Sequence, residues 1–263
     1  MESKYFVASK DTKVLTHGWL SSGSTDWIQN QKNSYLDSFD YNVIIVDWHE
    51  LAQNPVYPWA AICTRYVGKR LAKLLDSLVG SYQARGVQMH LIGHSLGAQI
   101  MGQAGMFFGE TPLLLILIGL DPARPLFEIP PISDDCRLDK SDAEFVDIIH
   151  TAAGVYGYKD SHGEADYYPN GGKTPQPGCP GPLAEADLHF TDSCSHGRAV
   201  EYFTESVQRG VPFTAYPCNS YQDFEDGQCK SNSSHMGDPH EKSHGDYYLH
   251  TRNESKYAMG DEY

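Results

Sequence analysis

Short runs of apolar and β-branched residues recur along the first half of the chain, at 13–15, 42–46, 87–92 and 113–120. The last three are uniformly apolar instead of alternating, which is typical of parallel strands covered on both faces. Between the second and third runs, residues 60–78 carry apolar side chains at helical spacing, which predicts a helix, and Gly80 is expected to end it. Strands that alternate with helices predict an α/β fold with a mostly parallel sheet and helices on both of its faces.

The rest of the pattern is less regular. Residues 154–192 are rich in Gly, Pro and Tyr, which indicates long functional loops. No repeat or linker divides the 263 residues, so we expect a single domain over residues 1–263. The first 13 residues are polar and contain no apolar signal core. Because a strand follows almost at once, we expect the natural N-terminus to be incomplete here.

The net charge limits the kinds of partner that we expect the protein to bind. The formal net charge of −14 argues against nucleic acid and against electrostatic docking on anionic membranes. The longest apolar stretch, residues 113–118, is far too short to span a bilayer. Any lipid contact is therefore expected to be mainly apolar, with no transmembrane segment.

The six cysteines favour an oxidising compartment. Cys179 with Cys194, and Cys218 with Cys229, enclose intervals rich in Gly, Pro, Ser or Asp, as in disulfide-stapled loops. Cys63 and Cys136 have no local partner, and a bond between the two is a further candidate pairing. Glycosylation sequons begin at Asn232 and Asn253. Together these features favour a secreted, extracellular protein.

The most informative motif is Gly-His-Ser-Leu-Gly at residues 93–97. It follows a predicted strand and precedes a predicted helix at 96–108, which is the context of the nucleophile elbow of α/β-hydrolases. The glycines are required because a Cβ would crowd the tight turn that exposes the serine hydroxyl. We therefore predict an α/β-hydrolase fold with Ser95 as the nucleophile.

A serine nucleophile needs a base and an orienting acid, and in this fold the acid and then the histidine follow the serine in the chain. Asp121 leaves the predicted strand 113–120 and fits the acid, although a turn-forming Asp-Pro is the alternative. His196 follows Cys194 after the stapled loop and precedes a helical run, 199–207, so it fits the base. His150 is expected to be structural at a strand end, and the histidines after residue 234 to be solvated surface residues.

Two backbone N–H groups are needed to form an oxyanion hole. Leu96, directly after the nucleophile, is expected to supply one and Trp19 the other, and the Trp19 indole is a candidate lining of the acyl pocket. Residues 240–244 also match the His-Glu-x-x-His zinc pattern. Pro239 and Gly245 flank it closely, which disfavours the helix that such a zinc site requires.

Several longer motifs resemble the pancreatic lipase family. They are THGWL (16–20), VDW (46–48), GHSLGA (93–98), GLDPARP (119–125), RLDKSDAEFVDIIHT (137–151), DYYPNGG (166–172), PGC (177–179) and CSHGRAVEYF (194–203). They stand in the family's order over about nine-tenths of the chain. The resemblance implies the triad Ser95, Asp121 and His196 with oxyanion donors at Trp19 and Leu96, and it implies no required cofactor. The chain ends before the C-terminal β-sandwich of the vertebrate lipases, so no colipase is expected. It therefore resembles the compact insect lipases and venom phospholipases A1 of the same family.

The resemblance also bears on the substrate. The candidate lid between Cys179 and Cys194 is short, with Leu183, Leu188 and Phe190 as its apolar positions, and the loop at 152–161 is short as well. Both features are similar to phospholipase A1 members, in which a small cover leaves room for a polar headgroup at a membrane, micelle or emulsion surface. A triacylglycerol or galactolipid lipase is the alternative, as is a non-catalytic lipid-binding relative such as an insect yolk protein.

Some family members hold a structural calcium near positions that match Asp139 and Asp142. Carboxylate oxygens suit that ion, and the alternative is a pair of solvated acids on a turn.

Overall fold

The computed structural model describes residues 6–82, 89–109, 115–181, 188–208, 210–229, 231–237 and 243–261. Within these residues the strands form one nine-stranded sheet in the order β2-β1-β3-β4-β5-β6-β9-β7-β8. All neighbouring pairs from β2 to β9 are parallel, whereas β7 runs antiparallel to β9 and to β8. The strands are β1 Thr12–Thr16, β2 Asn42–Val46, β3 Met89–His94, β4 Leu115–Leu120, β5 Phe145–Ile149, β6 Ala165–Pro169, β7 Thr214–Pro217, β8 Ser234–His235 and β9 Gly245–Leu249.

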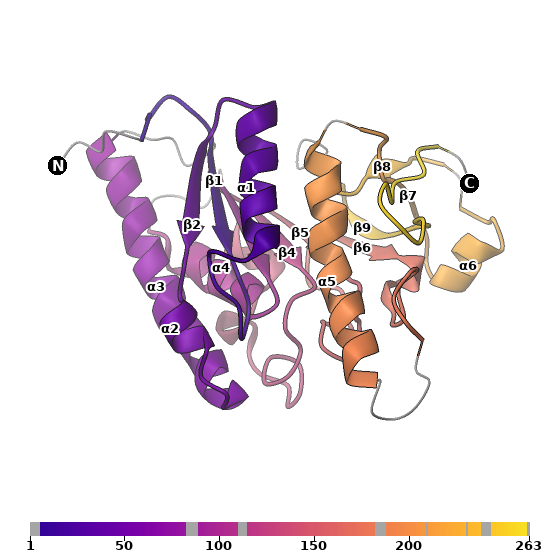
Figure 1. The fold of residues 1–263 in the computed structure, drawn as a ribbon, viewed down its shortest axis with the longest axis horizontal. Helices are drawn as coiled ribbons and strands as arrows, with labels where there is room; N and C mark the ends of the chain where they lie inside the picture. The colour runs from indigo at the N-terminus through magenta and orange to yellow at the C-terminus, as the bar shows by residue number, and fades with distance from the viewer. Residues whose placement is uncertain are drawn as a thin grey trace.

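Helices cover both faces of this sheet (Figure 1). The helices α1 and α5 pack side by side on one face, and α3 and α4 pack together on the other. Each pair closes its own apolar core against the sheet. The α-helices are α1 Asp26–Ser38, α2 His49–Ala52, α3 Tyr57–Tyr82, α4 Leu96–Phe107, α5 Leu188–Val207 and α6 Tyr221–Glu225. Among the described helices, none is both long and apolar enough to cross a bilayer.

The predicted α/β sheet with helices on both faces is confirmed. The strand predicted at residues 42–46 has the observed bounds of β2, and the helix predicted at 60–78 lies inside α3. One expectation was wrong, because the segment 154–192, predicted to be loops, contains a buried strand, β6. A further strand that was not predicted, β9, lies in the hydrophilic segment after residue 234 and pairs with both β6 and β7.

The two local disulfides predicted from cysteine spacing are present, joining Cys179 to Cys194 and Cys218 to Cys229. The pairing of Cys63 with Cys136 was wrong, because the structure leaves both as free thiols. The Cys63 side chain packs against the core beneath α3. The Cys136 sulfur instead accepts a hydrogen bond from the Arg65 guanidinium at 3.5 Å.

The contact between α3 and α4 is close enough to require a glycine. A Cβ on Gly68 of α3 would lie 2.6 Å from the Gln103 Cβ and 2.9 Å from the Ile100 carbonyl oxygen, both on α4. Twelve residues further along the same helix, a Cβ on Gly80 would meet no atom within 4 Å. The two glycines therefore differ in packing while sharing a helical backbone.

We expect Gly68→Ala to destabilise the fold by about 1–3 kcal/mol, since the added methyl group overpacks the α3–α4 contact. Gly80→Ala is the matched control and should stabilise the fold by roughly 0.5–1 kcal/mol through helix propensity alone. Urea denaturation of both variants measures the difference in unfolding free energy. Equal effects of the two substitutions would contradict the close helix contact.

Candidate active site

Ser95 occupies the sharp turn between β3 and α4. Its backbone has φ 58° and ψ −122°, a conformation that non-glycine residues adopt only where the surroundings enforce it. A Cβ on Gly93 would lie 2.3 Å from the Gly97 carbonyl oxygen, and a Cβ on Gly97 would lie 2.7 Å from the His17 carbonyl oxygen. The turn therefore needs both glycines of the motif, and it presents a partly exposed serine at the carboxyl edge of the sheet.

Asp121 and His196 are brought together at the same edge. Asp121 follows β4, is fully buried, and accepts a hydrogen bond from His196 Nδ1 at 2.6 Å through its Oδ2. Its Oδ1 accepts the backbone N–H groups of Thr151 at 2.8 Å and Ala152 at 3.0 Å. His196 lies inside α5 and not on a loop before a helix, because α5 begins at Leu188, eleven residues before the helical run read from the sequence.

Because Nδ1 of His196 is engaged by Asp121, Nε2 is the ring nitrogen available to exchange a proton with a serine hydroxyl or a substrate. His94, the residue before Ser95, holds the His196 backbone by donating its Nε2–H to the carbonyl oxygen at 3.0 Å. The two rings lie 4.4 Å apart between centroids. Burial, together with the neighbouring His196, lowers the pKa of His94 well below 6.5, so His94 is a neutral donor at physiological pH. Tyr156 packs edge-on against the other side of His196, at 5.7 Å between ring centroids.

The loop after β1 packs directly against Ser95. A Cβ on Gly18 would lie 2.8 Å from the Ser95 Cβ and 3.3 Å from its Oγ, so only glycine permits this approach. The buried His17 ring donates from Nδ1 to the Gly18 carbonyl oxygen at 2.9 Å, and its Nε2 lies 2.9 Å from Asp47 Oδ1. That carbonyl belongs to the same planar trans peptide as the Trp19 N–H, so holding the oxygen also fixes the direction of the N–H. His17 and Asp47 were not predicted, because their sequence positions give no sign of this contact.

The second expected donor, Leu96, is the first residue of α4, where a backbone N–H has no partner within the helix. The Trp19 indole donates from Nε1 to the Asn54 carbonyl oxygen at 2.7 Å and packs edge-on against Tyr57. Tyr57 in turn donates to the Pro125 carbonyl oxygen at 3.0 Å. These contacts hold the indole against the start of α3, and its role in an acyl pocket stays a prediction.

The candidate lid lies largely outside the described residues, and with it Leu183 and the side chains of Leu188 and Phe190. Its anchor points are described. The Cys179–Cys194 bond ties the segment before the lid to α5, and the Gln176 N–H donates to Ser195 Oγ at 3.0 Å. Residues 240–242 of the zinc pattern also lie outside the described residues.

Asp139 and Asp142 form a helix cap. The Asp139 carboxylate accepts the Ser141 N–H, and the Asp142 carboxylate accepts the Asp139 N–H at 2.9 Å, at the two ends of a short 3-10 helix. Burial, with the nearby Asp139 and Asp134 charges, raises the pKa of Asp142 to about 8. The cap uses one oxygen of each carboxylate, and a calcium ion at this pair stays a prediction. No cluster of three or more metal-ligating side chains occurs within the described parts of the chain.

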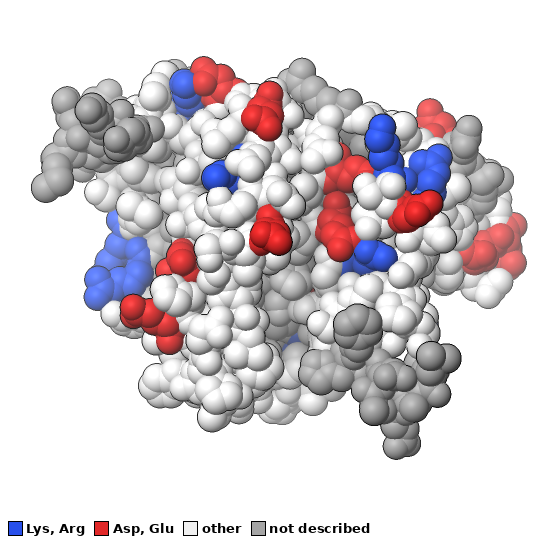
Figure 2. Space-filling view, viewed as in Figure 1, with Lys and Arg blue, Asp and Glu red and all other residues white. Residues whose placement is uncertain are grey.

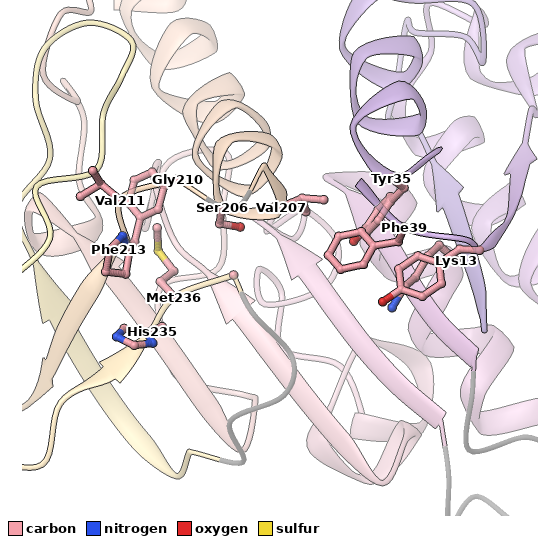
Figure 3. Close-up of a pocket in the computed structure, with 13 residues that line it drawn as sticks. Lys13, Tyr35, Phe39, Ser206, Val207, Gly210, Val211, Phe213, His235 and Met236 are labelled. Atoms are coloured by element: carbon pink, nitrogen blue, oxygen red, sulfur yellow. The ribbon is translucent and has the colours of Figure 1, made fainter. Parts of the chain in front are cut away.

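A cavity of about 310 Å³ lies between the ends of α1 and α5, and neither Ser95, Asp121 nor His196 lines it. Figure 3 shows Lys13, Tyr35 and Phe39 on one side of it and Val211, Phe213 and Met236 on the other. Lys13 pairs with His90 near the start of β3, whereas Ser95 follows the end of that strand. The cavity is therefore not part of the site around Ser95.

The strand order, the elbow and the acid–histidine pair together define an α/β-hydrolase. The chain belongs to the lipase family, since the model for the family described as Lipase matches residues 1–257. It is similar to lipase member H-B of Xenopus laevis, with 38% identity over 227 residues that cover 86% of this chain and 48% of that protein. Lipase member H of Oryctolagus cuniculus is 39% identical over 235 residues, covering 88% and 50%.

Inactive pancreatic lipase-related protein 1 of Homo sapiens is 35% identical over 244 residues, covering 87% of this chain and 51% of that protein. The chain thus spans about half the length of these curated relatives.

His150 lies directly before the two residues that donate to Asp121, and buried contacts hold it in place. Its Nε2 lies 2.7 Å from Asp166 Oδ1, both side chains are buried, and its ring stacks on Tyr168 at 4.2 Å. Burial alone would lower the pKa of His150, but the hydrogen bond and charge of Asp166 outweigh it and raise the pKa. The two residues after His150, Thr151 and Ala152, are those that donate to Asp121. As expected from the sequence, His150 is a structural residue at a strand end.

The raised pKa of His150 gives the fold a pH dependence. A group whose pKa is higher in the folded state contributes its full stability below its unfolded pKa, near 6.5, and loses that contribution as the pH rises through the folded value. We expect Asp166→Asn to cost about 3 kcal/mol at pH 6 and distinctly less at pH 9. Urea denaturation at both pH values tests this, with the exposed Asp160→Asn as control. A loss of equal size at both pH values would contradict a charged His150.

Proposed function

We propose that this protein is a lipid carboxylic-ester hydrolase in which Ser95, His196 and Asp121 form the catalytic triad. The observation that carries the proposal is the 2.6 Å hydrogen bond from His196 Nδ1 to the buried Asp121, at the same sheet edge as the strained Ser95 turn. A histidine oriented by a buried carboxylate, with a serine at a sharp strand–helix turn, is the arrangement that enzymes use for acyl transfer.

In the proposed reaction, Ser95 Oγ attacks the ester carbonyl carbon while His196 Nε2 takes its proton. The oxyanion of the tetrahedral intermediate accepts hydrogen bonds from the N–H groups of Trp19 and Leu96. His196 then returns the proton to the leaving alcohol, and an acyl-Ser95 ester remains. Water, deprotonated by His196, attacks this ester and releases the fatty acid, after which Ser95 recovers its proton. No cofactor takes part.

Exposed apolar side chains around the site favour a lipid substrate. Leu20 follows Trp19, Leu126 and Ile129 lie on the loop after Asp121, and Val155 precedes Tyr156. Each exposes at least 36% of its surface, and each lies close in sequence to a residue of the site. Apolar surface of this kind, close to a catalytic edge, fits the surface of a membrane, micelle or emulsion.

Within the lipids we favour a phospholipid, hydrolysed as by a phospholipase A1, on the basis of the short lid and the short loop at 152–161. The two disulfides support an extracellular location, and exposed Asn232 and Asn253 are available for glycosylation. Colipase is not expected as a partner. A triacylglycerol or galactolipid lipase is the second candidate. A non-catalytic lipid-binding protein is the third, since one similar human protein is named as inactive.

The decisive experiment compares hydrolysis of phosphatidylcholine labelled at sn-1 with hydrolysis of a triacylglycerol emulsion. Ser95→Ala should abolish release of the acyl chain from either substrate, because the nucleophile is lost. Ser77→Ala, which alters an exposed serine on α3, is the control and should leave the rate unchanged.

Release of the sn-1 chain identifies a phospholipase A1. Cleavage of triacylglycerol alone would support the proposed triad but contradict the inference that the short lid favours a phospholipid substrate. A folded protein with no Ser95-dependent release from any ester is a lipid-binding relative and not an enzyme.

The His17–Asp47 pair should act on the rate through the oxyanion hole. Asp47→Asn removes the charge that holds His17, which in turn holds the Gly18–Trp19 peptide. We expect kcat on a soluble short-chain ester to fall roughly tenfold with KM nearly unchanged, since loss of one complete donor costs about 10²–10³ in kcat. Asp40→Asn, at another exposed carboxylate, is the control. A rise in KM at constant kcat would show that the pair affects binding and not the transition state.

A further inference from the structure

One helix departs from the acidic character of the rest of the chain. Between its first residue and Asp76, α3 contains no Asp or Glu, although the whole chain has 34 of these and only 20 Lys and Arg. Four of those 20 cations fall within residues 65–73. They are spaced so that they share one side of the helix with three large apolar or aromatic residues. We define the α3 outer face by these seven residues, Trp59, Ile62, Arg65, Tyr66, Lys69, Arg70 and Lys73.

The apolar members of this face are exposed to an unusual degree. Ile62 exposes 73% of its surface, Tyr66 57% and Trp59 51%. The fold does not use them, because the opposite side of α3 already buries Val67, Leu71 and further residues in the core. Large aromatic and aliphatic side chains interleaved with Lys and Arg on one helix face are typical of helices that lie on a lipid surface.

The cations are held in place but not neutralised. Arg65 and Lys69 lie over the Phe107 ring, at 5.3 and 4.5 Å from its centroid, and Arg70 donates to the Tyr66 hydroxyl. Within the described parts of the chain, none of the four forms an ion pair with a carboxylate. Figure 2 shows Lys and Arg side chains gathered over α3 at the left edge of the molecule, with acidic side chains nearby. Arg65 also interacts electrostatically with the exposed Asp135, so Lys69, Arg70 and Lys73 supply most of the attraction for an anionic surface.

The α3 outer face is continuous with the apolar residues near Ser95. The first residue of α3, Tyr57, touches both Trp19 and the Pro125 carbonyl, and exposed Val56 and Trp59 flank it. From Trp59 to Lys73 the helix rises about 21 Å, so the face extends from the active-site edge along the side of the molecule. The start of this face therefore lies beside Trp19, in the loop that packs against Ser95.

We propose that the α3 outer face docks the protein on membranes rich in anionic lipid headgroups. The cations bind the headgroups while Trp59, Ile62 and Tyr66 enter the interfacial layer, and the orientation of Ser95 toward that surface rests on the proposed function. The net charge of −14 does not oppose this locally, because salt screens charges beyond about 8 Å in physiological solution. Each Lys or Arg near an anionic leaflet contributes roughly a fivefold gain in binding.

The test measures vesicle binding in the Ser95→Ala background, so that no lipid is consumed. The variant replaces Arg65, Lys69, Arg70 and Lys73 with Gln. The matched control replaces four exposed lysines off this face with Gln, Lys140, Lys159, Lys173 and Lys256. Sedimentation with phosphatidylcholine vesicles containing 30% phosphatidylserine gives the partition coefficient of each protein, and thermal unfolding checks that each is folded.

We expect the α3 variant to bind anionic vesicles at least 50-fold more weakly than the parent, and the control to change less than threefold. Binding by the parent should also weaken as salt is raised. A second variant, Ile62→Ser with Trp59→Ala, should weaken binding while leaving the salt dependence in place. Equal binding by the α3 variant and the control overturns the proposal. Absence of any vesicle binding also overturns it.

These outcomes are separable from those of the proposed function. Hydrolysis of a soluble ester by the α3 variant in the Ser95 background should match the parent, because the triad is untouched. An inactive protein that still binds anionic vesicles through α3 would refute the enzyme and keep the docking surface. An active enzyme whose vesicle binding does not depend on the α3 charges would support the proposed function and refute the docking surface.

Discussion

Burial of the Asp121 carboxylate is the constraint on which the site is built. A buried carboxylate is costly unless donors surround it. Here the donors come from two N–H groups after β5 and from His196 on α5, so three separate parts of the chain must meet at one point. Gly157 closes the remaining side, since a Cβ there would lie 2.2 Å from Asp121 Oδ1. The positions of β4, β5 and α5 relative to one another are thus tied to a single side chain.

The elbow adds a second constraint that is steric and not electrostatic. Gly18, Gly93 and Gly97 each leave room for backbone where a side chain would collide. The space they release lets β1, β3 and α4 approach closely enough for the Gly18–Trp19 peptide to lie beside Ser95. The His17–Asp47 contact then sets the direction of that peptide. Packing brings the groups together, and hydrogen bonds orient them.

Much of this could be predicted from local pattern. The strands β1 to β4 stand out as short apolar runs, α3 by its helical spacing and α4 by its place after the Gly-x-Ser-x-Gly motif, and Ser95 and Asp121 follow such strands. The strand β9 could not be predicted, because the sequence around Asp246, Tyr247 and Tyr248 is polar and typical of a loop. The strand forms through pairing with β6 and β7, which the local sequence does not indicate. The true start of α5 was missed for a related reason, since its first turns carry few apolar residues of their own.

The contacts of His94, His17 and Asp47 belong to a third group. Each residue was visible in the sequence, but its partner lies 30 or more positions away, and a single sequence carries no signal of that distance. The indole of Trp19 is a similar case. Its backbone lies where the motif predicts, whereas its side chain is directed by Asn54 and Tyr57.

The Cys179–Cys194 bond also makes the protein sensitive to its redox surroundings. It ends two residues before His196 and joins α5 to a segment that is otherwise held there by the Gln176–Ser195 hydrogen bond. A reductant that opens the bond would remove this tie from the turn of helix that carries His196, whereas the two large cores contain neither cysteine. The proposed activity should therefore be lost before the fold is, and a chain retained in a reducing compartment would be folded yet inactive until it reached an oxidising one.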